Sequence, residues 1–292
     1  MTKRIIILIC TLLVMQLAAC SSKTVTIEGF SAPESVISDG TYFYVSNVGE
    51  ELKPMDKDGD GYISRLSAEG RVLDRKFING LNAPKGMAVL GGILYVADID
   101  HFKGFALSDR KMVLDLDFSA EGTSFLNGIT VTGSNDLLVS AMDKDELYQV
   151  QVGENPSFSK VIVEGELYGP NGLCFDPETG ILYIASFGKD HKPNGIVGKG
   201  KIKNGKLIYK KIYSQNGLYD GIVVSNGKVI VSDWVEFKKS GQLIQIDPET
   251  GEAAIIKLAE KIGGPADFYL DKKEKRLWIP MMMENKVMIT RY

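Results

Sequence analysis

The chain repeats one short unit six times, and this repeat constrains the fold more than any other feature of the sequence. Each unit begins with a small or polar turn, continues as an apolar strand, reverses in a hairpin turn and ends in a second apolar strand. The six units are APESVISDGTYFYVSN (32–47), APKGMAVLGGILYVAD (83–98), LNGITVTGSNDLLVSA (126–141), PNGLCFDPETGILYIAS (170–186), YDGIVVSNGKVIVSDW (219–234) and PADFYLDKKEKRLWIP (265–280). No useful length of chain after residue 20 has the period of a helix, so we expect an all-β protein.

The spacing of the units indicates how many strands accompany each one. Corresponding positions recur at intervals of 42 to 51 residues, and further strand candidates lie between the units. Four short strands with their turns occupy roughly 40–50 residues, which is the size of one propeller blade. The sequence therefore predicts a six-bladed β-propeller over residues 28–292, in which the early segment TVTIEG pairs with the last strand, KVMITRY, and closes the ring. Two β-sandwiches are the alternative, but they require no six-fold repeat, and no linker divides the chain.

The first residues read as a lipoprotein export signal. A basic start, MTKR, precedes the apolar run IIILICTLLVMQL, which is too short for a membrane-spanning helix. The following LAAC resembles the bacterial lipobox, in which the cysteine becomes the lipidated first residue. We therefore expect a signal peptide at 1–19, lipidation of Cys20 and a tether over 20–27. An ordinary signal peptide with a cysteine by chance is the alternative.

The expected location is the cell envelope, with the membrane contacted through the anchor at Cys20. Residue 21 is Ser21 rather than aspartate, which by resemblance to diderm sorting signals favours the outer membrane, facing the periplasm. The net charge of −3 and the absence of any basic run argue against nucleic-acid binding. Apart from Cys10 in the signal and Cys20, the only cysteine is Cys174, so the mature chain has no pair for a disulfide.

A propeller places the start of each innermost strand at one mouth of the central channel, so one position in every unit contributes to a ring. At that position all six units carry a polar residue: Glu34, Lys85, Asn127, Asn171, Asp220 and Asp267. Polar groups that converge on one axis need partners, because a buried charge without one is costly. Three carboxylates against one lysine make the ring acidic, and five of the six side chains offer oxygen atoms.

Oxygen ligands from carboxylates and amides suit Ca²⁺ best and Mg²⁺ or Mn²⁺ second. The ring contains no histidine or cysteine, which argues against zinc or copper. Lys85 leaves alternatives open, since it could pair with Glu34 or Asp267, bind an anionic substrate, or occupy the place of the cation in a salt-bridged channel. The pair Asn171–Gly172 is also a common turn sequence, so a turn role alone would explain it.

The units APESV, LNGIT, PNGLCFDPETGILYIAS and YDGIVV resemble the senescence marker protein, gluconolactonase and luciferin-regenerating enzyme superfamily, a group of six-bladed propellers, over essentially residues 28–292. The runs DKDGDGYISRLSAEGRV and GLNAPKGMAVLGGILYVADID are similar to an exported bacterial branch of it, labelled gluconolactonase-like. The resemblance implies a divalent metal, usually Ca²⁺, held by Glu34, Asn127, Asn171 and Asp220. Related paraoxonase-type lactonases carry histidine where this chain has Lys85, and asparagine where it has Gly221.

Two other motifs carry less chemistry. The segment DKDGDGY (56–62) begins like a calcium loop, but the acid expected at loop position twelve is Ser67, so an acidic surface turn is the preferred interpretation. His101 and His191 are the only histidines, and His101 could lie at the channel mouth. No G-x-S-x-G motif is present, which leaves a nucleophilic hydrolase without support.

Two functions remain open at this point. The first is a metal-dependent hydrolase of a lactone or similar cyclic ester, with Asp220 as general base and with Lys85 and Asp267 as substrate-binding residues. Its partner would be a small-molecule substrate. The second is a non-enzymatic binding or scaffold propeller, in which a structural metal or a salt-bridged channel stabilises the fold, because propellers support both kinds of role.

Overall fold

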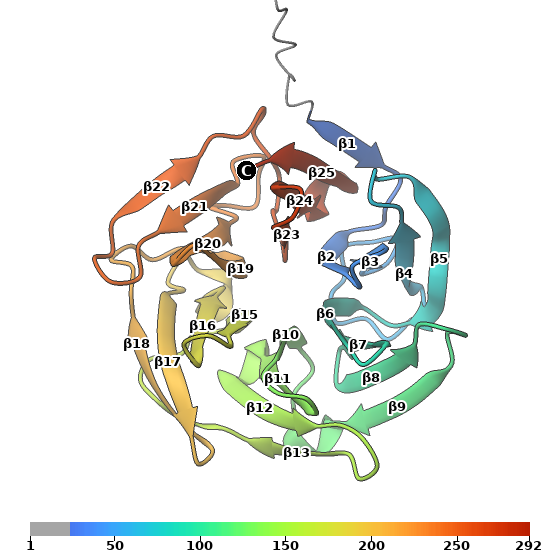
Figure 1. The fold of residues 1–292 in the computed structure, drawn as a ribbon, viewed down its shortest axis with the longest axis horizontal. Coiled ribbons are helices and arrows are strands. Elements are labelled where there is room, and N and C mark those ends of the chain that lie inside the picture. The colour runs from blue at the N-terminus through green and yellow to red at the C-terminus, as the bar shows by residue number, and fades with distance from the viewer. Residues whose placement is uncertain (1–23) are drawn as a thin grey trace, which may run out of the picture.

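The computed structural model describes residues 24–292, which form six β-sheets arranged as blades around one central axis (Figure 1). The fold class predicted from the sequence is confirmed: the described chain is all-β, with six blades. The predicted signal peptide, Cys20 and the beginning of the tether lie outside the described residues. None of the helices within residues 24–292 has the length and apolar character needed to cross a bilayer.

Each blade contributes one strand to the wall of the channel and continues outward by antiparallel hairpins. The innermost strands are β2 (Pro33–Ser38), β6 (Pro84–Leu90), β10 (Leu126–Val131), β15 (Pro170–Asp176), β19 (Tyr219–Ser225) and β23 (Tyr269–Asp271). The second strands are β3 (Phe43–Asn47), β7 (Ile93–Asp98), β11 (Asp136–Ala141), β16 (Ile181–Ser186), β20 (Lys228–Asp233) and β24 (Arg276–Met281). The repeated unit of the sequence is thus the inner hairpin of each blade.

The outer halves of the blades vary more. The third strands are β4 (Gly61–Leu66), β8 (His101–Ala106), β12 (Glu146–Gln151), β17 (Val197–Lys203), β21 (Gln242–Ile246) and β25 (Lys286–Arg291). The outermost strands are β5 (Val72–Leu81), β9 (Met112–Asp117), β13 (Ser157–Lys160), β18 (Lys206–Lys211), β22 (Ala253–Ile256) and β1 (Val25–Glu28). Blade 4 gains a fifth strand, β14 (Ile162–Glu164), which pairs in parallel with β18. Four short 3-10 helices occur at η1 (Ser119–Glu121), η2 (Met142–Lys144), η3 (Lys189–His191) and η4 (Met282–Glu284).

The ring closes between the two ends of the described chain, as the sequence predicts. Strand β1 is antiparallel to β25, with Val25 opposite Ile289, so the fold begins at Val25 rather than at the predicted boundary of 28. A second seam joins blades 6 and 1 near the axis, where the Asp267 amide donates to the Glu34 carbonyl at 2.9 Å. Pairing the first strand with the last joins the two ends of the described chain in one blade, with β1 as its outermost strand.

The hydrophobic core lies between neighbouring blades rather than in one central mass. Each adjacent pair of blades encloses its own cluster of buried apolar side chains. The second strands are buried along nearly their whole length because a blade covers each of their faces, which explains their continuous apolar sequences. One further apolar cluster draws on all six blades and lies at one end of the channel, beside the candidate site.

Candidate functional site

Five of the six predicted ring residues occupy equivalent positions. In blades 1 to 5 the pairing of the inner strand with the second strand shifts at the same place, where a bulge interrupts the ladder. A β-bulge re-aims the side chains that it carries. The five side chains at these bulges line one cavity, called the central chamber below: Glu34, Lys85, Asn127, Asn171 and Asp220.

Glycine follows the ring residue in blades 2 to 5 because the inner strands approach each other closely. A Cβ atom on Gly172 would lie 2.2 Å from the carbonyl oxygen of Asp220, and one on Gly128 would lie equally close to that of Asn171. No side chain is compatible with such contacts. The Asn171–Gly172 pair is therefore more than a turn, since the glycine lets adjacent blades bring their ring side chains together.

The sixth blade corrects one prediction. Its equivalent residue is Ala266, whose carbonyl oxygen lies 2.9 Å from the Cβ position of Gly221 and so faces that glycine as the Asp220 carbonyl faces Gly172. Asp267 is one residue further on and lines a different cavity at the opposite end of the channel. Asp267 is the polar residue nearest the start of this unit, which is why the sequence predicts it for the ring in place of the apolar Ala266. Asp267 therefore does not contact a ligand held in the central chamber.

Four buried oxygen atoms in the central chamber lack a hydrogen-bond donor. They are Oε2 of Glu34, Oδ1 of Asn127, Oδ1 of Asn171 and Oδ1 of Asp220. All four side chains are 3% exposed. A buried acceptor without a donor costs about 1–3 kcal/mol, so four such atoms from four blades at one place call for a common partner. The chemistry of this donor set, two carboxylates and two amide carbonyls, fits a hard divalent cation such as Ca²⁺.

The electrostatics of the ring also favour a bound cation. Burial, and then the charges of Asp220 and Asp267, raise the pKa of Glu34 well above its usual range. Burial and the charge of Asp267 also raise the pKa of Asp220. Carboxylates held close together in a poorly hydrated channel resist ionisation, and a cation between them would remove that cost.

Trp234 is a site residue that the sequence-based prediction did not identify. Its indole Nε1 donates to Oδ2 of Asp220 at 3.0 Å, and its ring lines the central chamber. The bond fixes one oxygen of the carboxylate and leaves Oδ1 directed elsewhere. The position could have been recognised from the alignment of the units, because the residue after each second strand is apolar in all six: Val48, Ile99, Met142, Phe187, Trp234 and Met282.

Lys85 forms no salt bridge in the channel. Among residues 24–292 no carboxylate lies within 4.0 Å of its ammonium group. The Nζ atom donates instead to the Ala83 carbonyl at 3.0 Å and lies 4.5 Å from the centre of the Phe125 ring. Burial lowers the pKa of Lys85 to about 8, although Glu34 acts in the opposite direction. The predicted pairing of Lys85 with Glu34 or Asp267 is therefore not present.

The walls of the central chamber are mostly apolar. The cavity has a volume of about 760 Å³, and its polar ring residues form the floor. Above them stand side chains from several blades and loops, including Leu52, Pro54, Met55, Phe125, Met142, Phe187, Trp234, Phe237 and Met282. A cavity with apolar walls and a few convergent polar groups has the character of a small-molecule site.

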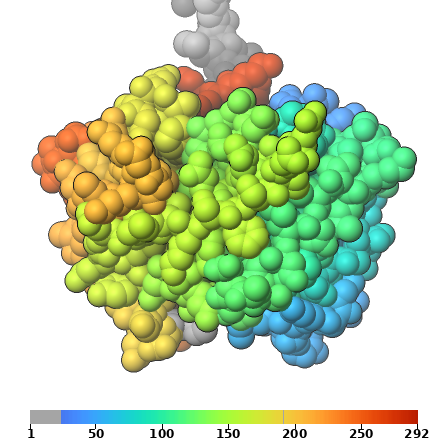
Figure 2. Space-filling view, turned by 90° about the horizontal axis from the view of Figure 1, so that it is seen from below, coloured from blue at the N-terminus to red at the C-terminus, as the bar shows by residue number. Residues whose placement is uncertain are grey.

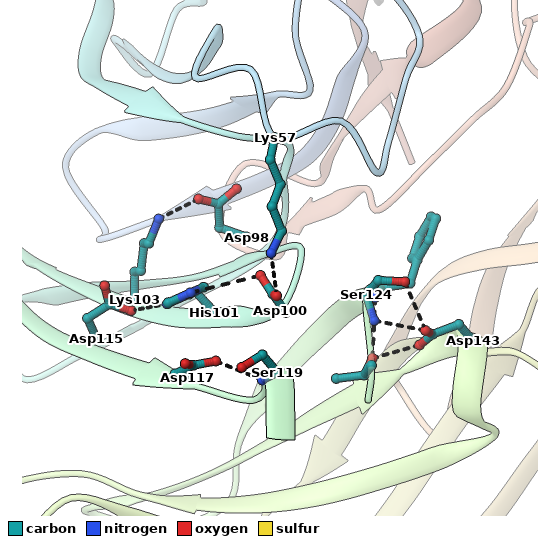
Figure 3. A network of polar contacts seen from close by, with 12 residues as sticks. Lys57, Asp98, Asp100, His101, Lys103, Asp115, Asp117, Ser119, Ser124 and Asp143 are labelled. Atoms are coloured by element: carbon teal, nitrogen blue, oxygen red, sulfur yellow. Dashed lines mark hydrogen bonds and ion pairs between the residues drawn. The ribbon is translucent and has the colours of Figure 1, made fainter. Parts of the chain in front are cut away.

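A second polar cluster lies outside the central chamber, on blade 2 (Figure 3). Ligand atoms of Asp100, His101 and Asp117 lie within 4.8 Å of one another. The Lys57 ammonium contacts Asp100 at 2.5 Å, and Nδ1 of His101 lies 2.6 Å from Oδ1 of Asp115 (Figure 3). A lysine thus already neutralises the buried carboxylate, and His101 does not line the chamber.

The acidic segment 56–62 supplies Lys57 to this cluster, and two of its carboxylates accept from amides of the same connection between β3 and β4. Oδ2 of Asp60 accepts from the amide of Glu50 at 2.8 Å, and Oδ1 of Asp58 accepts from the amide of Asp60 at 3.2 Å. Side-chain bonds of this kind are typical of turns. They support the interpretation as a surface turn. Of the side chain of the other histidine, His191, the structure gives no description.

No family model matches this chain, and no curated protein matches it. Solved structures do match. An auxiliary nutrient binding protein from Bacteroides thetaiotaomicron has a TM-score of 0.66 at 8% identity, covering 89% of this chain and 69% of that one. A catalytically inactive virginiamycin B lyase from Staphylococcus aureus has a TM-score of 0.62 at 11% identity, covering 92% and 99%. A 6-phosphogluconolactonase-like protein from Bacteroides fragilis has a TM-score of 0.57 at 15% identity, covering 85% and 76%. At these identities the similarity shows the propeller fold.

Proposed function

We propose that this protein is a divalent-cation-dependent hydrolase of a lactone or a similar cyclic ester, acting in the central chamber. The observation that carries the proposal is the set of four buried oxygens without donors, one from each of four blades. Glu34, Asn127, Asn171 and Asp220 would hold the cation, with Ca²⁺ preferred and Mg²⁺ or Mn²⁺ as alternatives. A propeller with a lactonase-like description among its structural neighbours makes a hydrolytic role consistent with the fold.

The chemistry divides between the bound cation and the side chains of the chamber. The cation would act as a Lewis acid that draws electron density from the ester carbonyl. Oδ1 of Asp220 would face the cation, while Oδ2, which Trp234 holds in place, accepts a proton from the attacking water. Asp220 then returns that proton to the ring oxygen as its bond to the acyl carbon breaks, so one lactone and one water give one hydroxy acid.

Lys85 supports this reaction through its charge. Its ammonium group belongs to the same ring as Glu34 and Asp220, and no carboxylate of the described chain binds it. A lactone becomes a carboxylate on hydrolysis, so negative charge develops where a cationic side chain can stabilise it. Lys85 therefore binds the acyl oxygens of substrate and product in this proposal.

A binding propeller is the second candidate. The feature that favours it is the absence of a histidine, cysteine or serine nucleophile from the lining of the central chamber within the described chain. In that case the cation would be structural, and the apolar walls would hold a ligand without changing it. A salt-bridged channel receives no support from the contacts of Lys85.

Metal binding and hydrolysis are tested in two steps on purified protein without its signal peptide. Thermal unfolding is measured with EGTA and then with added Ca²⁺, Mg²⁺ or Mn²⁺, and hydrolysis of a lactone panel is followed under the same conditions. The proposal predicts stabilisation by at least one cation and hydrolysis that EGTA abolishes. Stabilisation without hydrolysis would favour the binding propeller, and insensitivity to all three cations would refute both the site and the hydrolase.

The proposed location in the cell envelope has its own test. Replacement of Cys20 by serine, Cys20→Ser, should prevent lipidation and release soluble protein from the membrane fraction, because the acyl chains provide the only proposed anchor. The measurement is fractionation after a salt wash, with the parent protein as reference. A Cys20→Ser variant that stays with the membrane would contradict the lipobox interpretation.

A further inference from the structure

One wall of the central chamber is an aromatic cluster built by blades 4 and 5. Phe187 follows β16, while Trp234 and Phe237 follow β20. The ring centres of Phe187 and Trp234 lie 5.4 Å apart, and those of Trp234 and Phe237 are separated by the same distance, both edge to face. Such packing makes a rigid apolar surface. All three rings line the chamber, and Phe237 is 48% exposed.

The facing wall comes from the long connection between β3 and β4 in blade 1. Leu52, Pro54 and Met55 of this connection line the chamber, and Leu52 and Met55 are 46% and 55% exposed. Blades 1 and 4 stand opposite each other in the six-membered ring (Figure 1). The chain near residue 50 (blue) and the chain near residue 190 (yellow) project from the same edge of the molecule in Figure 2. The chamber is therefore deepened by two projecting apolar walls.

The chamber separates its polar groups from its apolar groups by depth. Every buried side-chain oxygen that lacks a donor and lines the chamber belongs to its floor. Two carboxylates higher in the wall already have donors: Asp143 accepts from Thr123 at 2.6 Å, and Asp145 accepts from the amide of Gly169 at 2.7 Å. The other charged residues of the upper wall are exposed to solvent in the connections after β11 and β16: Lys144, Lys189 and Asp190. A polyhydroxylated ring such as a sugar lactone would set its hydroxyl groups against aromatic and methionine side chains, where they find few partners.

From this arrangement we infer that the substrate is a lactone or cyclic ester that carries an extended hydrophobic substituent, an alkyl chain or an aromatic ring, rather than a sugar lactone. The polar ester group lies on the floor, beside Lys85 and Asp220. The hydrophobic substituent lies between the aromatic cluster and the 52–55 wall. This inference rests on the proposed hydrolase for turnover, whereas the preference for an apolar ligand rests on the walls alone.

The first experiment compares a homologous series. Hydrolysis of δ-valerolactone and of its butyl, hexyl and octyl derivatives is measured with Ca²⁺ present, with glucono-δ-lactone as the polar reference. Each buried methylene contributes about 0.8 kcal/mol, so kcat/KM should rise about fourfold for each methylene until the walls are filled. Glucono-δ-lactone should be a poorer substrate than the octyl lactone by more than a hundredfold. A flat series, or a preference for glucono-δ-lactone, would overturn the inference and leave the hydrolase standing.

A second experiment separates ligand preference from turnover. The corresponding octyl δ-lactam resists hydrolysis, and its binding can be followed by the fluorescence of Trp234. The chain has two tryptophans, and Trp278 is fully buried in blade 6, so a Trp278→Phe background leaves Trp234 as the only reporter. Saturable binding of the lactam, with no response to unsubstituted valerolactam or to gluconate, supports the inference even if no lactone is hydrolysed. Equal responses to all three probes would overturn it.

Substitutions in the two apolar walls test where the hydrophobic substituent binds. Phe237→Ser and Met55→Ser each remove part of one wall, and both side chains are partly exposed, so the fold should tolerate the changes. Each variant should lower the ratio of kcat/KM between the octyl lactone and δ-valerolactone about tenfold, since a half-buried large side chain contributes about 1.4 kcal/mol. Ile255→Ser on the outermost strand β22, where the side chain is 66% exposed, is the matched control and should leave the ratio unchanged. Ratios unaffected by both wall variants would contradict the placement of the substituent.

Discussion

The two ends of the channel are built from the same six inner strands, yet they offer different chemistry. At one end lies the central chamber, whose floor carries the four oxygens without donors. At the other lies a cavity of about 570 Å³, called the far cavity here, which is lined by the later residues of the inner strands and by Asp267, Asp271 and Arg276. The two aspartates of the far cavity have partners: Asp271 contacts Arg276 at 3.0 Å, and Asp267 accepts from Ser35 at 2.6 Å.

This difference teaches which features of a propeller end indicate function. A cavity and a set of carboxylates occur at both ends, so neither distinguishes them. The β-bulges do distinguish the two ends, because they turn one polar side chain from each of five blades into the central chamber. The connections between strands also distinguish the two ends. The long loop after β3 and the segments after β16 and β20 form apolar walls around the central chamber. The following changes test the contrast.

Asp220→Asn should have the largest effect. In the parent protein, Ca²⁺ at a hundred times its dissociation constant should add about 2.7 kcal/mol of stability, or roughly 5–10 °C in melting temperature for a domain of this size. The variant loses a charged ligand and the proposed base, so both this response and lactone hydrolysis should disappear. Asp271→Asn in the far cavity is the matched control and should keep the full response. Equal responses in the two variants would remove the distinction between the two ends.

Asn171→Ala should have an intermediate effect. It deletes a neutral ligand but no charge, so calcium affinity should fall by about tenfold, less than in Asp220→Asn. The alanine methyl is smaller than the amide that it replaces, so the fold should remain intact. Calorimetric titration with Ca²⁺ measures the change. An affinity equal to that of the parent would exclude Asn171 from the cation site.

Lys85→Met tests the positive charge that the lysine side chain places in the central chamber. Because burial lowers the pKa of Lys85 to about 8, its charge is disfavoured in the folded state. The cost is complete below pH 8 and vanishes as the pH approaches the unfolded value of 10.5. The variant should therefore be more stable by up to about 3 kcal/mol at pH 7, with a smaller gain at pH 9.5. Its calcium affinity should be equal or higher, since a repelling charge is gone.

The measurement for Lys85→Met is chemical denaturation at both pH values, with calorimetry for calcium. Destabilisation at pH 7 would mean that the lysine serves as the counter-charge of the ring. That result, together with a parent insensitive to calcium, would restore the salt-bridged channel.

Asp267→Asn should have the smallest effect on calcium binding and hydrolysis, because it acts below the floor and outside both the chamber and its walls, although it should change stability. Burial raises the pKa of Asp267 to about 6, so ionisation costs stability as the pH rises from 3.8 through 6. Asparagine keeps an acceptor for Ser35 and removes the charge, which should add about 3 kcal/mol above pH 6 and nothing below pH 4. Denaturation curves across this range measure it. A gain that is independent of pH would assign the effect to packing instead.

Sequence alone determined the number of blades, the closure of the ring and five of the six positions in it. The physical reason is that a closed ring brings equivalent positions of a repeat together, so periodicity becomes proximity without any knowledge of side-chain contacts. Glu34, Lys85, Asn127, Asn171 and Asp220 could be found in this way. The sixth position was misassigned, because the polar Asp267 was preferred to Ala266, although Pro265 aligns with Pro33 of the first unit.

Only the tertiary structure revealed what surrounds the ring. The bond from Trp234 to Asp220 joins two side chains whose spacing in the sequence carries no signal. It exists because the start of β19 lies beside the end of β20 in the antiparallel pair. The apolar walls come from connections that differ in length and composition from blade to blade, so the repeat says nothing about them. Lys85 shows the same limit: its charge is visible in the sequence, but whether a carboxylate lies within 4.0 Å depends on distances across the channel, which only the folded ring sets.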